Sequence, residues 1–281
     1  MPVYLGPINL GALIMTDKYA VIGNPIEHSK SPVIHNAFAK QTAQDMSYER
    51  VLAPLDGFFS TVKDLFAQGF KGANVTVPFK FEAYKICDSL SARAKSSGSG
   101  AVNTLINVNG KIHGDNTDGA GLRTDIEQNL GVAVVNKNIL ILGAGGAAHG
   151  VLNSLIGAKS ITIANRSLDR AMELVMSISD CEASASSFEA LDKPYDLIIN
   201  ATSAGLTNSE LPIPDVIFGK NCLAYDMMYG RETPFMAQAR RNGACVADGL
   251  GMLVEQAAEA FYLWRGVRPE TQPVIEMVRA L

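Results

Sequence analysis

The sequence predicts an α/β fold whose second half is a doubly wound parallel sheet. Residues 139–142 form an uninterrupted apolar run, as expected of a strand buried on both faces of such a sheet. A glycine-rich loop follows at 143–148, and residues 147–156 continue in a helical pattern. Beyond this unit, short apolar segments alternate with helical ones, which is the order that builds parallel sheets covered by helices.

Length and composition indicate a globular protein with room for two domains. The chain has 281 residues, of which 47% are hydrophobic and 19% charged. Its formal net charge of −4 argues against a dedicated nucleic-acid binder, which would usually be basic. Residues 1–14 are apolar but too short to span a bilayer and lack a basic region, so we expect no membrane segment. We interpret them as an extended start or a disordered leader, with Met15 as a natural beginning of the fold.

Cysteine and histidine usage points to the cytoplasm and to a protein without a metal. The four cysteines are scattered and form no C-x-x-C pair, which favours reduced thiols. The four histidines show no metal-ligand spacing.

The first half predicts short strands at 19–23, 48–51, 101–106 and 111–116, with a hairpin turn at 107–110 and helices at 33–41 and 55–68. Pro32 suits the start of the first helix, and Ser31 suits its N-cap. Ser29 and Ser31 lie two apart, so both hydroxyls would project to one side of an extended segment. From local pattern alone, a cap is the simpler interpretation of Ser31.

Polar residues alternate with valines at 74–77. Asn74 and Thr76 therefore share one face, and Lys80 follows the strand just after Pro78. A polar face leading to a lysine suits a small-molecule site, although a solvated sheet face is the simpler alternative. Asp118 precedes a predicted helix at 119–130, where an N-cap role is an equal alternative to a functional one.

The loop at 143–148 has the G-x-G-x-x-A pattern of a dinucleotide-binding turn. Gly143 would allow the tight turn, Gly145 would let a pyrophosphate approach the backbone, and a small residue at 148 would let helix and strand pack closely. Glycine-rich turns are common, so the position of this one between strand and helix is what favours the binding function.

The residues after the next predicted strand, 160–164, favour NADP over NAD. NAD-binding domains place an acid about 20 residues beyond the glycine loop to hold the ribose 2′-hydroxyl. Here Asn165 is neutral, and Arg166 and Arg170 follow it. A guanidinium can bind a 2′-phosphate through paired charge-assisted hydrogen bonds.

Further buried strands are expected at 196–200, 223–227 and 244–249. A helix at 251–266 carries an apolar stripe that we interpret as core: Leu253, Ala257, Ala260, Phe261 and Trp264.

From about Lys18 to near the C-terminus, the sequence resembles the shikimate dehydrogenase family. The resemblance rests on motifs that occur in family order: Gly-Asn-Pro at 23–25, His-Ser-Lys-Ser-Pro at 28–32, Asn-Val-Thr-Val-Pro-Phe-Lys at 74–80, Gly-Ala-Val-Asn-Thr at 100–104, Asn-Thr-Asp-Gly at 116–119, the loop at 143–148, Asn-Arg-Ser at 165–167 with Arg170, Asn-Ala-Thr-Ser-Ala-Gly at 200–205 and Asp-Gly-Leu-Gly-Met-Leu-Val-Glu-Gln at 248–256. Departures are small: residues 96–99 are more polar than usual, and Ser167 replaces a common threonine.

The resemblance implies a reaction and a set of roles. The reaction is reversible hydride transfer between NADPH and 3-dehydroshikimate, giving shikimate. Lys80 and Asp118 would be the catalytic pair, with the direction of proton transfer left open. The residues implied to bind substrate are Ser29, Ser31, Asn74, Thr76, Lys80, Asn103, Asp118, Tyr229 and Gln256. Those implied to bind NADP are Gly143, Ala144, Gly145, Gly146, Ala147, Asn165, Arg166, Ser167, Arg170, Thr202, Met227, Gly249 and Met252.

The family fold implies an N-terminal α/β substrate domain, 1–117 with 250–281, and a Rossmann-like NADP domain, 118–249. The last helices would return to the first domain, leaving a cleft with hinges near Asp118 and Gly249. A monomer or a homodimer is expected, with no nucleic-acid or membrane partner. Three alternatives stay open: a relative that also oxidises quinate, a silent NADP(H)-binding regulator, and a purely structural module.

Overall fold

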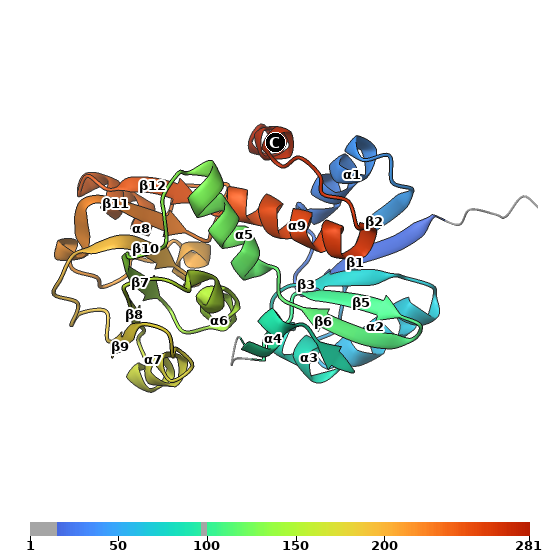
Figure 1. Ribbon diagram of the computed structural model, residues 1–281, viewed down its shortest axis with the longest axis horizontal. Helices are drawn as coiled ribbons and strands as arrows, with labels where there is room; N and C mark the ends of the chain where they lie inside the picture. Colours follow the sequence, from blue (N-terminus) through green and yellow to red (C-terminus); the bar gives the residue numbers. More distant parts are fainter. Residues whose placement is uncertain (1–15, 97–99) are drawn as a thin grey trace, which may run out of the picture.

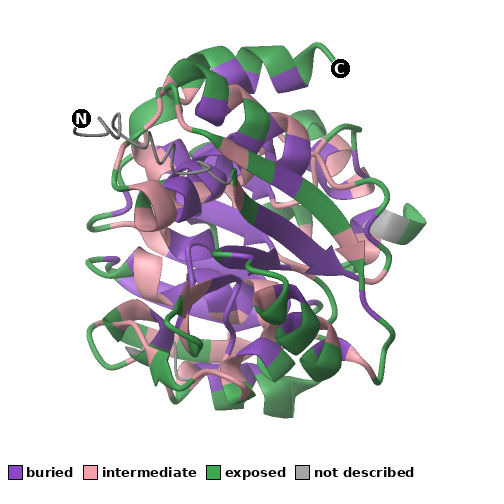
Figure 2. Cartoon of the chain, turned by 90° about the vertical axis from the view of Figure 1, so that its right-hand side faces the viewer, coloured by how far each residue is buried: buried purple, intermediate pink, exposed green. Residues whose placement is uncertain are grey.

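Two six-stranded sheets stand side by side in the computed structural model, which describes residues 16–96 and 100–281 (Figure 1). The segment expected to be a leader, and the polar residues at 97–99, lie outside the described residues. Helices cover the sheets, and two long connections cross between the halves. Figure 2 shows buried strands inside and exposed outer helix faces.

The first sheet contains parallel and antiparallel strands in the order β2-β1-β3-β5-β6-β4. The strands are β1 (Asp17–Gly23), β2 (Met46–Leu52), β3 (Gly72–Val75), β4 (Ser89–Leu90), β5 (Thr104–Val108) and β6 (Lys111–Asp115). The helices of this half are α1 (Ser31–Gln41), α2 (Phe58–Ala67), α3 (Lys80–Lys85) and α4 (Ala92–Ser96). The predicted hairpin turn is confirmed: Asn109 and Gly110 have φ of 53° and 82°, the left-handed pair that a tight β5–β6 turn requires.

The second sheet is wholly parallel, in the order β12-β11-β10-β7-β8-β9. Its strands are β7 (Asn138–Leu142), β8 (Ser160–Ala164), β9 (Glu182–Ser186), β10 (Tyr195–Asn200), β11 (Phe218–Asp226) and β12 (Cys245–Asp248). Its helices are α6 (Gly146–Leu152), α7 (Leu168–Val175) and α8 (Pro234–Arg241). The chain winds outward in both directions from β7 and β10, so the doubly wound prediction is confirmed. Ligands bind such sheets at this switch point, beyond the carboxyl ends of the strands.

Helices α5 (Asp118–Thr124) and α9 (Leu250–Arg265) run between the two sheets and pack against each other. Glycine permits the contact: a Cβ on Gly121 would lie 2.6 Å from the backbone nitrogen of Gln256, and one on Gly251 would collide with the Asp125 carboxylate. The end of α9 and helix α10 (Gln272–Arg279) then lie against α1 of the first half. Of the apolar stripe predicted for α9, Ala257, Ala260 and Phe261 are buried core, whereas Leu253 and Trp264 are half-buried and Leu253 lines a cavity between the two halves.

Several predicted boundaries are wrong. The helix expected at 119–130 changes at Asp125 into a π-helical turn, Asp125–Asn129. The helix expected at 147–156 ends at Leu152 and continues as a 3₁₀ turn, Asn153–Leu155; Gly157, with φ of 91°, follows. The strand expected from 101 begins only at Thr104.

Some elements were missed altogether. Strand β9 (Glu182–Ser186) is built from small and polar residues at the sheet edge, so it lacks the apolar run that marks a buried strand. Further elements given no predicted range include α3, α4, β4, α8 and α10. Within the two described ranges, no helix is long and apolar enough to cross a membrane.

Candidate active site

A cavity of about 550 Å³ opens between the two halves. It lies where the strand ends of one sheet face the strand ends of the other. On one side, β1 and β3 end and β5 begins, because Ile22 pairs with Val75 and Asn74 pairs with Thr104. On the other side, Asn200 at the end of β10 pairs with Asp226 at the end of β11. Helix α9 begins at this edge and supplies one wall.

Every residue that the sequence implied to bind substrate lines this cavity: Ser29, Ser31, Asn74, Thr76, Lys80, Asn103, Asp118, Tyr229 and Gln256. Met227, Gly249 and Met252, expected near the nicotinamide, line it too. Further wall residues were not predicted to bind a ligand: Val21, Pro25, Ile26, His28, Val75, Met228 and Leu253, the last interpreted as core. Pro25 and His28 fall inside a motif already noted, and Met228 lies between two predicted residues, so adjacency was the available signal.

The remaining predicted cofactor residues lie outside the cavity wall, on loops and the first turns of helices at the carboxyl edge of the second sheet. Gly143 has φ of 102°, a conformation that favours glycine, and a Cβ there would meet the backbone of Ala201 and the methyl of Thr202 at 3.2 Å. The Gly143 N–H donates to the carbonyl of Ala164 at 2.7 Å. The loops after β7, β8 and β10 therefore adjoin. They carry Ala144, Gly145, Asn165, Arg166 and Ser167, while Gly146 and Ala147 begin α6 and Arg170 lies on α7.

Lys80 and Asp118 form an ion pair in the wall of the cavity. The Lys80 Nζ donates to Asp118 Oδ2 at 2.5 Å, and the Asn103 amide donates to Asp118 Oδ1 at 2.7 Å. Lys80 is the first residue of α3, which follows β3, and Asp118 is the first residue of α5. Their side chains are 18% and 9% exposed, so the pair is largely withdrawn from water.

The two N-cap interpretations are wrong. Helix α1 begins at Ser31 itself, and helix α5 at Asp118 itself; the cap positions are Lys30 and Thr117, and neither cap makes a side-chain hydrogen bond. Ser31 instead accepts a hydrogen bond from the Ser29 hydroxyl at 3.2 Å. The Asp118 carboxylate accepts hydrogen bonds from Lys80 and Asn103. Pro32 does occupy the first turn of α1, as predicted.

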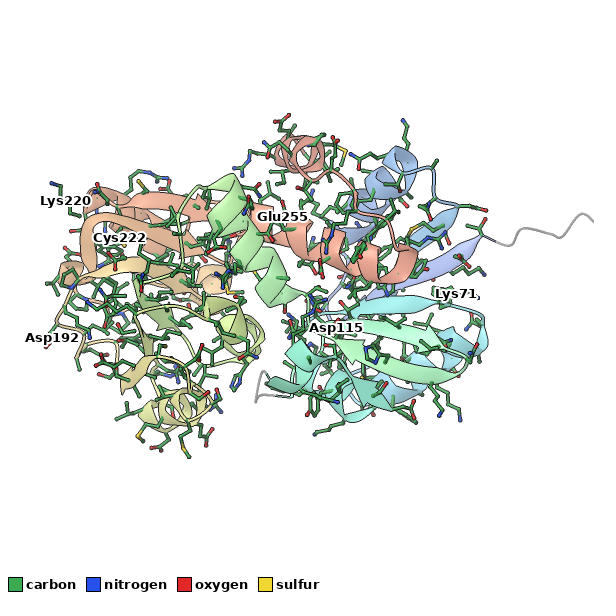
Figure 3. All side chains as sticks on the ribbon, in the orientation of Figure 1. Lys71, Asp115, Asp192, Lys220, Cys222 and Glu255 are labelled. Atoms are coloured by element: carbon green, nitrogen blue, oxygen red, sulfur yellow. The ribbon has the colours of Figure 1, made fainter. Side chains whose placement is uncertain are left out.

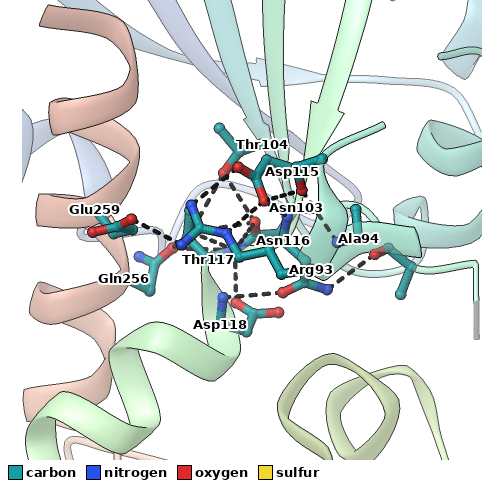
Figure 4. A network of polar contacts seen from close by, with 12 residues as sticks. Arg93, Ala94, Asn103, Thr104, Asp115, Asn116, Thr117, Asp118, Gln256 and Glu259 are labelled. Carbon is teal, nitrogen blue, oxygen red and sulfur yellow. Dashed lines mark hydrogen bonds and ion pairs between the residues drawn. The ribbon is translucent and has the colours of Figure 1, made fainter. Parts of the chain in front are cut away.

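An ion-pair network holds the chain just before Asp118 (Figure 4). Arg93 donates through Nε and Nη2 to both oxygens of Asp115, at 2.6 and 3.0 Å, and through Nη1 to Glu259 at 2.8 Å. Asp115 ends β6, and Glu259 lies one turn beyond Gln256 on α9. The network therefore ties α9 to the strand end that leads into Asp118. Figure 3 shows Asp115 at this strand end and Glu255 on α9 between the halves.

The charges in this network shift the protonation of Glu259. Its burial favours the neutral acid, but hydrogen bonds from Arg93 and Arg268 outweigh that effect and lower the pKa of Glu259 below its ordinary value of 4.5. In the cavity wall, burial raises the pKa of the Tyr229 phenol, so it stays protonated.

Within the described ranges, no group of three or more His, Cys, Asp or Glu side chains is placed to hold a metal ion. The arrangement can bind a small polar molecule between a lysine–carboxylate pair and the phosphate-loop side of a doubly wound sheet. This fold and site define a nicotinamide-dependent dehydrogenase built from two α/β units.

The chain belongs to the shikimate dehydrogenase family. Residues 21–105 match the shikimate dehydrogenase substrate binding domain, 126–209 match shikimate/quinate 5-dehydrogenase, and 249–279 match the shikimate 5′-dehydrogenase C-terminal domain.

Relatives agree along nearly the whole chain. The shikimate dehydrogenase (NADP(+)) of Methylobacillus flagellatus is 57% identical over 94% of this chain and 99% of that protein. An Ael1 enzyme from Pseudomonas putida is 44% identical, with a TM-score of 0.87 over 93% of this chain and 97% of its own. Shikimate 5-dehydrogenase from Thermus thermophilus, solved with NADP(H) and shikimate, is 32% identical, with a TM-score of 0.84 over 94% of this chain and 99% of its own.

The lowered pKa of Glu259 predicts that this residue makes a pH-dependent contribution to the free energy of unfolding. Because the folded-state pKa is lowered, ionised Glu259 stabilises the fold above about pH 4.5, and this contribution is lost as the pH falls through the lowered value. Glu259→Gln should therefore be less stable than the wild type near neutral pH, and the difference should narrow towards pH 3. Urea unfolding over a pH series measures it. A difference that stays constant from pH 7 to pH 3 would contradict the assignment.

Proposed function

We propose that this chain catalyses the reversible NADPH-dependent reduction of 3-dehydroshikimate to shikimate, a step in aromatic amino-acid biosynthesis, with Lys80 and Asp118 as the catalytic pair. The observation that carries the proposal is the 2.5 Å contact between these side chains in a cavity that also reaches Met227, Gly249 and Met252. Membership in the family of NADP-dependent shikimate dehydrogenases supports the reaction.

The pair acts at the ketone oxygen. Negative charge develops there as hydride reaches the carbon, so a fixed cation beside it stabilises the transition state. Lys80 supplies that cation, and Asp118 holds it in place from the opposite side. Proton transfer to and from the oxygen is assigned to the two residues jointly. Because Asn103 occupies the other oxygen of Asp118, the carboxylate cannot turn away from Lys80 without losing a second hydrogen bond.

The substrate's carboxylate and its ring hydroxyls would bind to different walls of the cavity. Ser29, Ser31 and Tyr229 offer hydroxyl donors for the carboxylate. Amide, hydroxyl and carboxylate groups for the ring hydroxyls come from Asn74, Thr76, Asn103, Asp118 and Gln256. All of these side chains face the same cavity, which supports assigning them to one ligand.

The second sheet fits NADP, which supplies the hydride when bound. A Cβ on Gly145 would meet nothing within 4 Å, so the space beside this backbone is open to a phosphate group. Arg166 and Arg170 are exposed beyond β8, where they would bind the 2′-phosphate. Gly143, Ala144, Gly146, Ala147, Asn165, Ser167 and Thr202 would complete the site.

We also propose the domain limits 1–117 with 250–281 and 118–249. Helix α5 begins at Asp118 and α9 at Leu250, which supports hinges near Asp118 and Gly249. A cytoplasmic location, and a monomer or homodimer, are proposed with them; the four free cysteines suit a reducing compartment.

A substrate panel tests the reaction. With NADP⁺ and shikimate, the purified protein should produce NADPH absorbance, with a much lower kcat/KM for NAD⁺ and for quinate. A comparable kcat/KM for quinate would make the protein a dual shikimate and quinate dehydrogenase. Absence of NADP-linked turnover with both acids would overturn the proposal in favour of a binding function.

Lys80→Ala should lower kcat by roughly 10²-fold or more, because it removes the cation at the ketone oxygen. NADPH binding should stay nearly intact, since the glycine loop lies elsewhere, and fluorescence titration of NADPH measures this. Near-normal kcat would remove Lys80 from the chemistry.

Arg166→Ala should raise the KM for NADP⁺ by roughly 10-fold or more, the worth of a charge-assisted hydrogen bond, and leave the KM for NAD⁺ within about 2-fold. The matched control is Lys220→Ala. It removes an exposed cation near the start of β11, at the other end of the strand from Asp226 (Figure 3). Equal effects on both cofactors would refute a contact with the 2′-phosphate.

A further inference from the structure

The cavity residue Asn74 is held from behind by Tyr48, which does not itself line the cavity. Tyr48 lies on β2, the edge strand of the first sheet, and its side chain turns inward to be buried. The Tyr48 hydroxyl lies 2.7 Å from Asn74 Oδ1. Local sequence reasoning placed Tyr48 in a strand and assigned it no further role.

The partners of the Asn74 amide determine which way it faces. Its Nδ2 donates to the backbone carbonyl of Asn103 at 3.2 Å and to Thr104 Oγ1 at 3.1 Å. A carbonyl oxygen can only accept, so the nitrogen must be the atom on that side. The oxygen therefore faces Tyr48, and the phenol must be the donor.

This arrangement uses up the donors of Asn74. Both hydrogens of Nδ2 are engaged, and one of the two lone pairs of Oδ1 is taken by Tyr48. One lone pair remains for a molecule in the cavity.

Packing and burial keep Tyr48 in this role. Its ring stacks on His35 with centroids 4.1 Å apart and planes 9° from parallel. The ring centroid of Trp264 lies 6.2 Å from that of Tyr48. Burial raises the pKa of Tyr48 well above 10.0, so the hydroxyl remains a donor at any working pH. Burial also lowers the pKa of His35 to about 3, against a smaller opposing effect of the neighbouring Asn74 side chain. His35 thus packs as a neutral ring.

We propose that Tyr48 is a positioning residue that orients the Asn74 amide, so that Asn74 meets a bound ligand only as a hydrogen-bond acceptor. The ligand group at this point is then a hydroxyl that donates to Asn74, not a carbonyl or a carboxylate oxygen. This inference rests on the proposed function. It assigns Asn74 to a ring hydroxyl of shikimate and states that the hydroxyl donates the hydrogen bond and Asn74 accepts it.

Tyr48→Phe tests the proposal by deleting one oxygen. The KM for shikimate should rise roughly 2- to 15-fold, the worth of one neutral hydrogen bond, because the Asn74 amide loses one of the three hydrogen bonds that hold it in place. The KM for NADP⁺ should stay within about 2-fold. Circular dichroism and Tm confirm that the variant folds.

Tyr19→Phe is the matched control. Tyr19 faces Tyr48 across the β1–β2 register, is also buried, and stacks on the same Trp264 at 4.7 Å. Its hydroxyl lies 3.4 Å from Arg265 and outside the cavity wall. This variant removes a buried phenol oxygen from the same cluster and should leave the KM for shikimate unchanged. Equal KM increases in the two variants would overturn the proposal.

A double-mutant cycle separates positioning from general packing. In an Asn74→Ala background, Tyr48→Phe should cause no further rise in KM, because the amide it orients is gone. The same fold-increase in both backgrounds would overturn the proposal. Shikimate binding is measured by calorimetry in parallel. A wild type that binds shikimate without turnover contradicts the proposed reaction alone, since the Tyr48 comparison then stands on Kd.

Discussion

The contact between Lys80 and Asp118 is the constraint on which the rest of the site depends. An ion pair withdrawn from water loses hydration, and it is favourable only when geometry and further hydrogen bonds compensate. Asn103 provides the compensation by donating to the second oxygen of Asp118. Two short segments, one after β3 and one after β6, must therefore end at matched positions. The antiparallel pairing of β5 between those strands sets the match.

The two connecting helices extend that constraint to the other half of the molecule. Helix α5 starts with Asp118 and leads into the second sheet, and α9 returns from it carrying Gln256. Gly121 lets the helices approach until the backbone of one touches the other. Arg93 then binds both Asp115 and Glu259, so the strand end and α9 keep one relative position in the first half.

Sequence reasoning recovered most of the fold because its strongest signals are local. The apolar strand, the glycine turn and the helix stripe each follow from a few neighbouring residues. It failed where structure depends on distant partners: β9 is a strand only because it lies against β8, and Ser31 and Asp118 look like caps until the cavity is assembled. The site residues came from ordered motifs that resemble a family, not from spacing alone. Tyr48 shows the limit, since its hydroxyl reaches Asn74 only because β2 and β3 both pair with β1.

The polar residues at the strand ends must be satisfied as a set. Asn103, Thr104, Asp115, Asn116 and Thr117 are all buried, and each hydrogen-bonds to another member or to a neighbouring backbone group. An unpaired buried polar group is costly, so the loss of one member leaves others unsatisfied. This explains physically why such residues occur as contiguous blocks, Asn116-Thr117-Asp118 among them. The side chains that hydrogen-bond to the buried backbone also hold the Asp118 carboxylate beside Lys80. Stability and chemistry here therefore depend on the same hydrogen bonds.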